Sequence, residues 1–269
     1  KEKASMVVFE ATGGYESKLM NALNDSPIPM AMVNARQVRS FADAMNLVKT
    51  DKIDAEIIAK FAQVVNIKAQ VKKDVNQKAC DELISRRGQL IDMQTAEKNR
   101  LEHASKGILK EITAHISYLE KQIASIDKQL GEYIETNEVL KKNAKILKSV
   151  TGVGPVLTMT ILSRLPEIGM LSSKEIAKLV GVAPINNDSG KMSKKRRTIG
   201  GRMDIKGVLY MATMSATQKN PVIREFYQKL VQSGKPKMVA LVASMRKLIV
   251  ILNSMIKHQT LWNPHTNNP

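Results

Sequence analysis

The chain has 269 residues, 43% of them apolar, and carries 42 Lys and Arg against 25 Asp and Glu, a formal net charge of +17. This length and composition allow two or three domains with real cores, and the positive charge makes nucleic acid the default partner. A single cysteine, Cys80, excludes an intramolecular disulfide and a cysteine-cluster metal site. The absence of a run of 18 apolar residues and of a signal-peptide pattern favours a soluble, cytoplasmic protein.

The first 70 residues alternate strand and helix patterns. Residues 5–9 form an apolar run that predicts a buried strand, residues 15–24 predict a helix, and residues 27–33 predict a second strand. This order is typical of a parallel α/β arrangement, in which functional sites gather beyond the carboxyl ends of the strands. Glu10 lies at such an end.

Two further carboxylates, Asp51 and Asp54, lie three residues apart in the first turn of a predicted helix over residues 51–62. With Thr50 as the N-cap, both carboxylates project from one face. Acidic residues in a first turn also favour the helix dipole, by about 0.3–1 kcal/mol each, and need no further purpose. Together with Glu10, however, the pair can converge on one divalent cation, for which oxygen ligands are suited.

From about residue 77 to residue 147 the pattern changes to long helices without strand signals. Apolar residues there follow the alternating spacing of four and three that is typical of a coiled coil. They are Ile112, Ile116, Leu119, Ile123, Ile126, Leu130 and Tyr133. Such a stripe pairs with a second copy in a dimer or folds back as a helical hairpin, and the sequence leaves both open.

Two glycines, Gly152 and Gly154, lie between two helical patterns in the stretch Gly-Val-Gly-Pro. The stretch resembles a helix-hairpin-helix, in which backbone N–H groups at a helix N-terminus bind a DNA phosphate. An ordinary Gly-Pro junction between helices would have the same residues. The positive charge of the chain favours DNA contact.

Residues 185–202 show little apolar pattern and are followed by predicted helices over 205–216 and 239–256. Ser189 lies here, between Asp188 and Gly190, beside a dense basic cluster whose natural counterpart is a phosphate backbone. A hydroxyl next to such cations can act as a nucleophile toward a phosphoryl group, although a loop serine is by itself a weak signal. The basic residues are Lys191, Lys194, Lys195, Arg196, Arg197, Arg202 and Lys206.

Three stretches occur in one order along nearly the whole chain. They are Phe9-Glu10-Ala11-Thr12-Gly13-Gly14-Tyr15, then Thr50–Ala55, and then Asp188-Ser189-Gly190, followed by a Gly-Arg pair and by Val208–Met211. In this combination they resemble the IS110 family of insertion-sequence transposases, which includes the Piv/MooV DNA invertases.

The resemblance implies a fold that is α/β plus all-α. A RuvC-like, ribonuclease-H-type domain with a DEDD carboxylate set would cover residues 1–70. A coiled-coil helical region would cover residues 71–146, and a helical, serine-carrying transposase domain with the helix-hairpin-helix-like element would cover residues 147–269. Glu10 matches the second acid of the set, Asp51 and Asp54 match the third and fourth, and Ser189 matches the serine.

The resemblance also implies a chemistry. The carboxylates would hold Mg²⁺, and Ser189 would attack a DNA phosphodiester to form a transient phosphoserine link. Some family members are guided by a structured noncoding RNA, and whether this chain is guided is open. The implied setting is the nucleoid-associated cytoplasm of a bacterium, with assembly as a dimer or tetramer.

One departure from the family pattern is that the first Asp of the set lies on a strand upstream of Lys1. We therefore expect a truncated chain that lacks the first strands of its sheet, binds metal weakly and catalyses poorly. Two other functions fit the same residues: a non-catalytic nucleic-acid-binding protein, in which the carboxylates only cap a helix, and a metal-dependent junction nuclease without serine chemistry.

Overall fold

The structure is a computed structural model that describes residues 5–45, 51–70, 75–184, 188–189, 192–193 and 197–264. For residues 51–53, 75–77, 188–189 and 192–193 it describes the backbone alone. The chain forms two compact units, residues 1–75 and residues 76–269.

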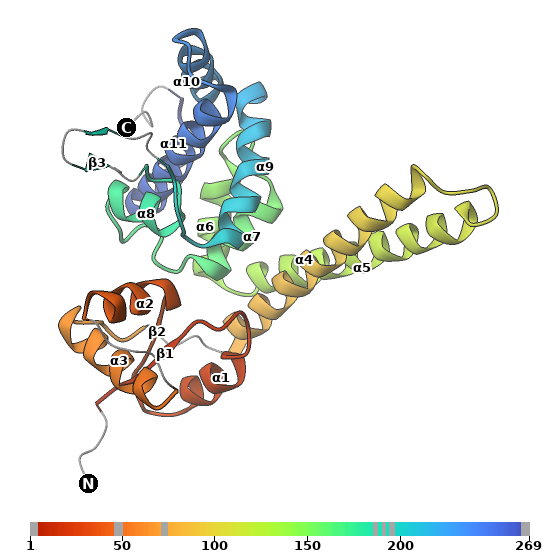
Figure 1. The fold of residues 1–269 in the computed structure, drawn as a ribbon. Coiled ribbons are helices and arrows are strands. Elements are labelled where there is room, and N and C mark those ends of the chain that lie inside the picture. The colour runs from red at the N-terminus through yellow and green to blue at the C-terminus, as the bar shows by residue number, and fades with distance from the viewer. Residues whose placement is uncertain are drawn as a thin grey trace. The chain divides into compact units, whose positions relative to one another are not determined.

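The first unit contains a parallel pair of strands with helices beside it (Figure 1). Strand β1 (Val7–Glu10) pairs with β2 (Met30–Val33), with Val7 opposite Met30 and Glu10 opposite Val33. Helix α1 (Ser17–Asp25) connects the two strands, and α2 (Ala35–Ala44) and α3 (Asp51–Val64) follow. The predicted strand–helix–strand order is therefore present, and it is compatible with an α/β, RuvC-like fold.

Helix α3 packs against both β1 and α2. Its residues Ile57 and Phe61, one helical turn apart, are buried together with Val33 of β2 and Val38 of α2. The rings of Phe41 and Phe61 meet edge to face with their centroids 5.6 Å apart. These apolar contacts fix α3 along the strand that ends in Glu10.

Helices α4 (Val75–Leu101) and α5 (Leu109–Glu135) form an antiparallel hairpin in the second unit (Figure 1). Links cross it in antiparallel order: Arg87 Nε donates to Asp127 Oδ1 at 2.6 Å, and Gln94 donates to Glu120 at 3.1 Å. The apolar stripe of α5 faces inward, and Ile116, Leu119, Ile126 and Leu130 are buried. Of the two arrangements that the spacing allowed, the structure contains the fold-back within one chain.

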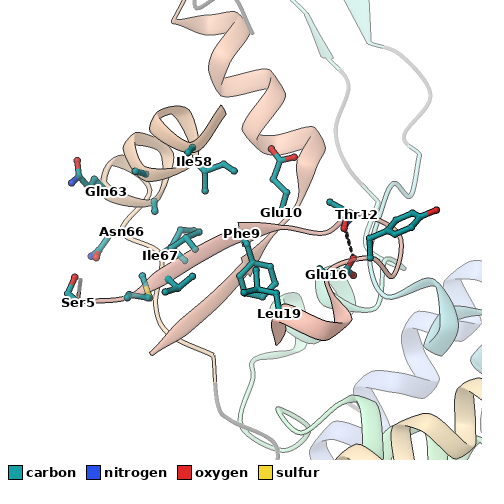
Figure 2. A pocket seen from close by; sticks show the side chains of 17 residues that line it. Ser5, Phe9, Glu10, Thr12, Glu16, Leu19, Ile58, Gln63, Asn66 and Ile67 are labelled. Carbon is teal, nitrogen blue, oxygen red and sulfur yellow. Dashed lines mark hydrogen bonds between the residues drawn. The ribbon is translucent and has the colours of Figure 1, made fainter. Parts of the chain in front are cut away.

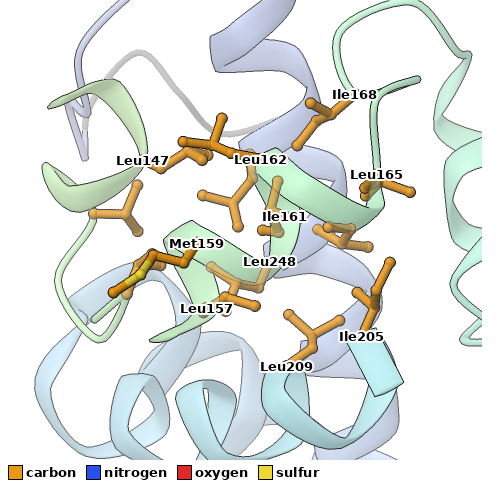
Figure 3. Packing of buried hydrophobic residues seen from close by; sticks show 14 of the residues in the cluster. Leu147, Leu157, Met159, Ile161, Leu162, Leu165, Ile168, Ile205, Leu209 and Leu248 are labelled. Atoms are coloured by element: carbon orange, nitrogen blue, oxygen red, sulfur yellow. The ribbon is translucent and has the colours of Figure 1, made fainter. Parts of the chain in front are cut away.

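The remaining helices of the second unit surround a continuous apolar core (Figure 3). Leu157 and Ile161 from α7 lie between Leu147 of α6, Leu209 of α9 and Leu248 of α11, and all five are buried. The helices are α6 (Glu138–Lys148), α7 (Pro155–Arg164), α8 (Ser173–Leu179), α9 (Met203–Lys219), α10 (Pro221–Gln232) and α11 (Lys237–His258).

Helix α11 is the one helix among the described residues that is long and apolar enough to cross a membrane. It contacts α6, α8, α9 and α10, and 61% of its most apolar window is buried inside the protein. Its apolar residues therefore serve the core of the second unit.

Polar side chains define where several of these helices begin. Asn137 accepts hydrogen bonds from two backbone N–H groups at the start of α6, and Asn220 does the same for α10. Ser172 and Glu175 form a capping box at α8. Pro155 begins α7, where its missing N–H removes no helical bond.

Candidate active site

Glu10 is the last residue of β1 and lines an open cavity of about 890 Å³ in the first unit. Along the cavity wall, Ile58 of α3 lies toward the Glu10 end and Gln63 lies toward Ser5 (Figure 2). Helix α3 therefore runs antiparallel to β1, and its first turn, which includes Asp54, lies at the carboxyl end of the strand. The sequence pattern predicts that the acidic residues converge at this end of the strand, and that convergence stays a prediction.

The described carboxylates of this end, Glu10 and Asp54, are both half-buried. Their oxygens suit a hard divalent cation such as Mg²⁺. The side chain of Asp51 and the whole of Thr50 lie outside the described residues. Among the described side chains no three of His, Cys, Asp and Glu gather closely enough to hold a metal ion, so the three-carboxylate site stays a prediction.

The loop after Glu10 is held by one carboxylate. Glu16 accepts hydrogen bonds from the backbone N–H of Thr12 at 3.0 Å, from its hydroxyl at 2.8 Å and from the N–H of Gly14 at 2.9 Å (Figure 2). Together with the backbone amide of Glu16 itself, which has the largest effect, these donors lower the pKa of Glu16 to about 2. The loop presents Tyr15 with 91% of its surface exposed.

Ser189 lies in a short antiparallel strand pair of the second unit. Strand β3 (Asp188–Ser189) pairs with β4 (Met192–Ser193), with Asp188 opposite Ser193 and Ser189 opposite Met192. Two residues link the strands, the spacing of a tight β-hairpin. Ser189 is the last residue of β3.

The predicted DNA-binding cations fall into three groups. Lys191, Lys194, Lys195 and Arg196 carry side chains outside the described residues, while Arg197 is exposed and Lys206 is half-buried. Arg202 differs, because both of its terminal nitrogens donate to the carboxylate of Glu167, at 2.7 and 2.6 Å. Its guanidinium is thus paired with a carboxylate, although a third of its side chain is exposed.

The hairpin between α6 and α7 is fixed against α9. Gly152 adopts a φ of +98°, and a Cβ there would lie 2.7 Å from Cβ of Ala216. Gly154 has open space around it and is the N-cap residue of α7 without a side-chain cap. The N-terminus of α7 therefore follows an exposed glycine, and the first N–H group of the helix itself belongs to Val156, because Pro155 has none.

Basic residues concentrate in the part of the chain that holds this hairpin and Ser189. Residues 139–269 contain 22 of the 42 Lys and Arg but only five of the 25 Asp and Glu. That half of the chain is therefore the strongly cationic one, and a phosphate backbone is its natural counterpart.

Comparison with known proteins decides the family. Residues 1–112 match the DEDD transposase family of IS110-type elements, and residues 144–228 match the Transposase IS116/IS110/IS902 family. The chain belongs to the IS110-type transposases. It is 25% identical to the pilin gene-inverting protein of Moraxella bovis and 26% identical to that of Moraxella lacunata, in each case over 93% of this chain and 80% of the relative.

A third relative is an uncharacterized 42 kDa protein of insertion element IS900 from Mycobacterium paratuberculosis, 24% identical over 56% of this chain and 39% of its own length. Family membership makes this chain an enzyme of the transposase and DNA recombinase class. Transposases act on DNA, and the DEDD family in general uses a divalent metal.

Sequence patterns missed two structural roles in this IS110-type transposase. Asn220 is fully buried, and its Nδ2 donates to the carbonyl of Thr151 in the hairpin. Glu167 pairs with Arg202 across 35 residues of sequence. Neither residue belongs to a periodic pattern, although an Asn directly before a Pro-led helix is a recognisable N-cap signal.

Proposed function

We propose that this IS110-type transposase cuts and rejoins DNA strands with a Mg²⁺ site made by Glu10, Asp51 and Asp54 and with Ser189 as the nucleophile. The observation that supports the proposal is the direction of α3, which runs antiparallel to β1, so that the helix turn with Asp51 and Asp54 begins on the side of Glu10 (Figure 2). A bound Mg²⁺ would supply charge neutralisation at the scissile phosphate.

The chain's own residues perform the remaining steps. The Oγ of Ser189 attacks the scissile phosphorus, the bond from phosphorus to the sugar oxygen breaks, and that oxygen takes up the proton lost by the serine and leaves as a hydroxyl. The resulting phosphoserine ester keeps the bond energy of the phosphodiester. Attack by the hydroxyl of a second strand reverses the step, rejoins DNA and releases the serine.

DNA contact would come from the cationic part of the chain. We propose that Lys191, Lys194, Lys195, Arg196, Arg197 and Lys206 neutralise phosphates around Ser189, and that Gly152 and Gly154 shape a hairpin whose backbone N–H groups bind a further phosphate. Such contacts give affinity and position without reading sequence. The enzyme would act in the bacterial cytoplasm, where its DNA lies.

A denaturant-resistant protein–DNA adduct tests the serine chemistry. Incubation with labelled element-end DNA and Mg²⁺ is expected to give an adduct that disappears in Ser189→Ala and persists in Ser193→Ala, the matched serine of the paired strand. Strand cleavage that survives Ser189→Ala unchanged would favour a metal-dependent nuclease instead. Tight binding without cleavage or adduct would favour a non-catalytic binding protein.

A magnesium titration tests the carboxylates separately. Mg²⁺ is expected to raise the melting temperature of the chain, because a ligand that binds only the folded state stabilises it. Asp54→Asn or Glu10→Gln should abolish the rise, whereas Glu56→Gln, an exposed residue of the same helix, should keep it. An unaltered rise in Asp54→Asn would contradict the site.

Two further partners follow from the family resemblance: a guide noncoding RNA, and further copies of the chain in a dimer or tetramer. We propose both as properties to be tested on protein purified from its host. A defined RNA that copurifies, and whose digestion abolishes DNA targeting, would support the guide. A sedimentation mass of one chain at working concentration would contradict the assembly.

A further inference from the structure

The segment that carries Ser189 leaves the helical core of the second unit at the end of α8. This end is a Schellman motif: Gly181 has a φ of +77°, its N–H donates to the carbonyl of Lys178 at 3.0 Å, and the N–H of Val182 donates to the carbonyl of Ala177 at 2.9 Å. The chain returns to the core at Gly200 and Gly201, directly before α9.

The chain segments that leave the core at Gly181 and return to it at Gly200 and Gly201 are in direct backbone contact. A Cβ on Gly181 would overlap the carbonyl oxygen of Gly200, and a Cβ on Gly201 would overlap the backbone nitrogen of Gly181. Beside this contact, the N–H of Arg202 donates to the carbonyl of Leu179 at 3.0 Å. These glycines form a closed neck at the base of the serine segment, and we call the Gly181–Gly200–Gly201 contact the glycine neck.

The side chain of Arg202 ties the glycine neck to the helices behind it. Besides its two bonds to Glu167, Nη1 donates to the carbonyl of Arg164 at 2.7 Å, at the end of α7. Arg164 in turn donates to Asp204 of α9 at 2.6 Å and to the hydroxyl of Ser85 of α4 at 2.6 Å. Two arginines thus connect the neck with three helices.

We propose that Arg202, through Glu167, is a positioning residue that holds the glycine neck closed and so fixes the β3–β4 hairpin with Ser189 for attack, instead of serving as a phosphate contact. A bidentate arginine–carboxylate pair is geometrically specific, which suits a fixed support. Closing the base of the segment reduces the conformations open to the nucleophile. The catalytic part of this inference rests on the proposed role of Ser189; the closed neck does not.

The two roles for Arg202 predict different salt dependence of DNA binding. A phosphate contact contributes to the slope of log affinity against log salt, and its loss reduces that slope by about 1. Arg202→Met is therefore expected to leave the slope unchanged, because the guanidinium is already neutralised by Glu167. Arg197→Met, at an exposed side chain five residues earlier, is the matched control and should reduce the slope.

The rate of limited tryptic cleavage between Lys191 and Arg197 measures how often the glycine neck opens, and it does not depend on the serine chemistry. We expect Arg202→Met and Glu167→Gln to be cut there about tenfold faster than the unmodified chain, since protease access tracks the local opening equilibrium. Arg202→Lys keeps the charge but loses the bidentate fork, and should also be cut faster. The exchanged pair, Arg202→Glu with Glu167→Arg, should recover protection.

The adduct assay then connects the neck to catalysis. Arg202→Met should form the Ser189 adduct about tenfold more slowly at unchanged DNA affinity, and the exchanged pair should recover part of the rate. One result would overturn the role of Arg202 in the neck in favour of a phosphate contact. In it, every variant with a cooperative thermal transition keeps normal protection against trypsin, and Arg202→Met reduces the slope of log DNA affinity against log salt. If the Arg202 and Glu167 variants are cut faster but the unmodified chain never forms an adduct, the serine chemistry would be overturned and the role of Arg202 in closing the neck would be kept.

Discussion

The side-chain amide of Asn220 donates to the carbonyl oxygen of Thr151 at 3.1 Å while its side-chain oxygen accepts from the N–H groups of Val222 and Ile223. One buried residue thereby begins α10 and ties it to the hairpin between α6 and α7. The hairpin is therefore held from behind, with its exposed glycine left available to a ligand.

Replacing Asn220 separates these two tasks. Asn220→Ala should reduce the free energy of unfolding by about 1–3 kcal/mol, because it removes the partner of the buried Ile223 N–H group and of two part-buried backbone groups, the Val222 N–H and the Thr151 carbonyl. Asn220→Asp keeps the acceptor for α10 but loses the donor to Thr151. Its free energy of unfolding should therefore lie between those of the unmodified chain and Asn220→Ala. Chemical denaturation measures both, with Asn99→Ala on the exposed side of α4 as the control. Equal stability of all three variants would contradict the tie.

The two glycines of the hairpin should respond differently to alanine. Gly152→Ala must place a Cβ against Ala216 at a φ of +98°, and should cost about 1–3 kcal/mol of stability. Gly154→Ala meets open space at an ordinary φ of −92° and should change stability by less than about 1 kcal/mol. Thermal unfolding gives the comparison. If the hairpin binds phosphate, Gly154→Ala should nevertheless weaken DNA binding.

Glu16 makes the loop after β1 sensitive to acid. Its pKa in the folded protein, about 2, lies below the ordinary value of 4.5, so its stabilising effect is complete above pH 4.5 and is lost as the pH falls toward 2. Glu16→Gln should therefore be less stable than the unmodified chain at pH 6, and the difference should narrow between pH 4.5 and 2. Melting curves across this pH range test the direction in which the stability difference changes. Glu56→Gln, at an exposed residue, is the control.

The ion pair between Arg87 and Asp127 should stabilise the helical hairpin more than the exposed pair on the same helix. Arg87 donates twice to the Asp127 carboxylate, at 2.6 and 3.2 Å, and only 15% of its side chain is exposed. A double-mutant cycle with Arg87→Met and Asp127→Asn should give a coupling of about 1–3 kcal/mol. The pair of Lys128 and Glu132, on the helix of Asp127 and with 79% and 64% of the side chains exposed, should give less than about 1 kcal/mol.

The sequence predicted the helix over α5 and its buried face, but it did not predict which segment this face packs against. The spacing from Ile112 to Tyr133 identified the buried face of α5, because periodicity records which side of a helix avoids water. It could not choose between a second chain and α4, since both offer the same apolar surface. The contacts that favour α4, such as Arg87 with Asp127, join residues 40 positions apart and leave no local pattern.

The same distinction applies to the candidate site. Glu10 was predicted from its place after an apolar run, and Asp54 from its place in a first turn; both positions are local features that the structure contains. Arg202 was grouped with its basic neighbours because composition counts charge without showing its partner. Only the fold brings Glu167 to it, and that contact changes which phosphate-binding residues are proposed.

The glycine neck has a consequence for how such enzymes can vary. The segment between Gly181 and Gly200 can change in length or residue content without disturbing the apolar core. Its two ends are already in backbone contact with each other where they leave the core. The proposed nucleophile, Ser189, and the basic residues near it in the sequence would then form a segment that can be exchanged as a unit. Grafting the segment of a relative between these glycines should transfer its reactivity while the recipient keeps its own fold.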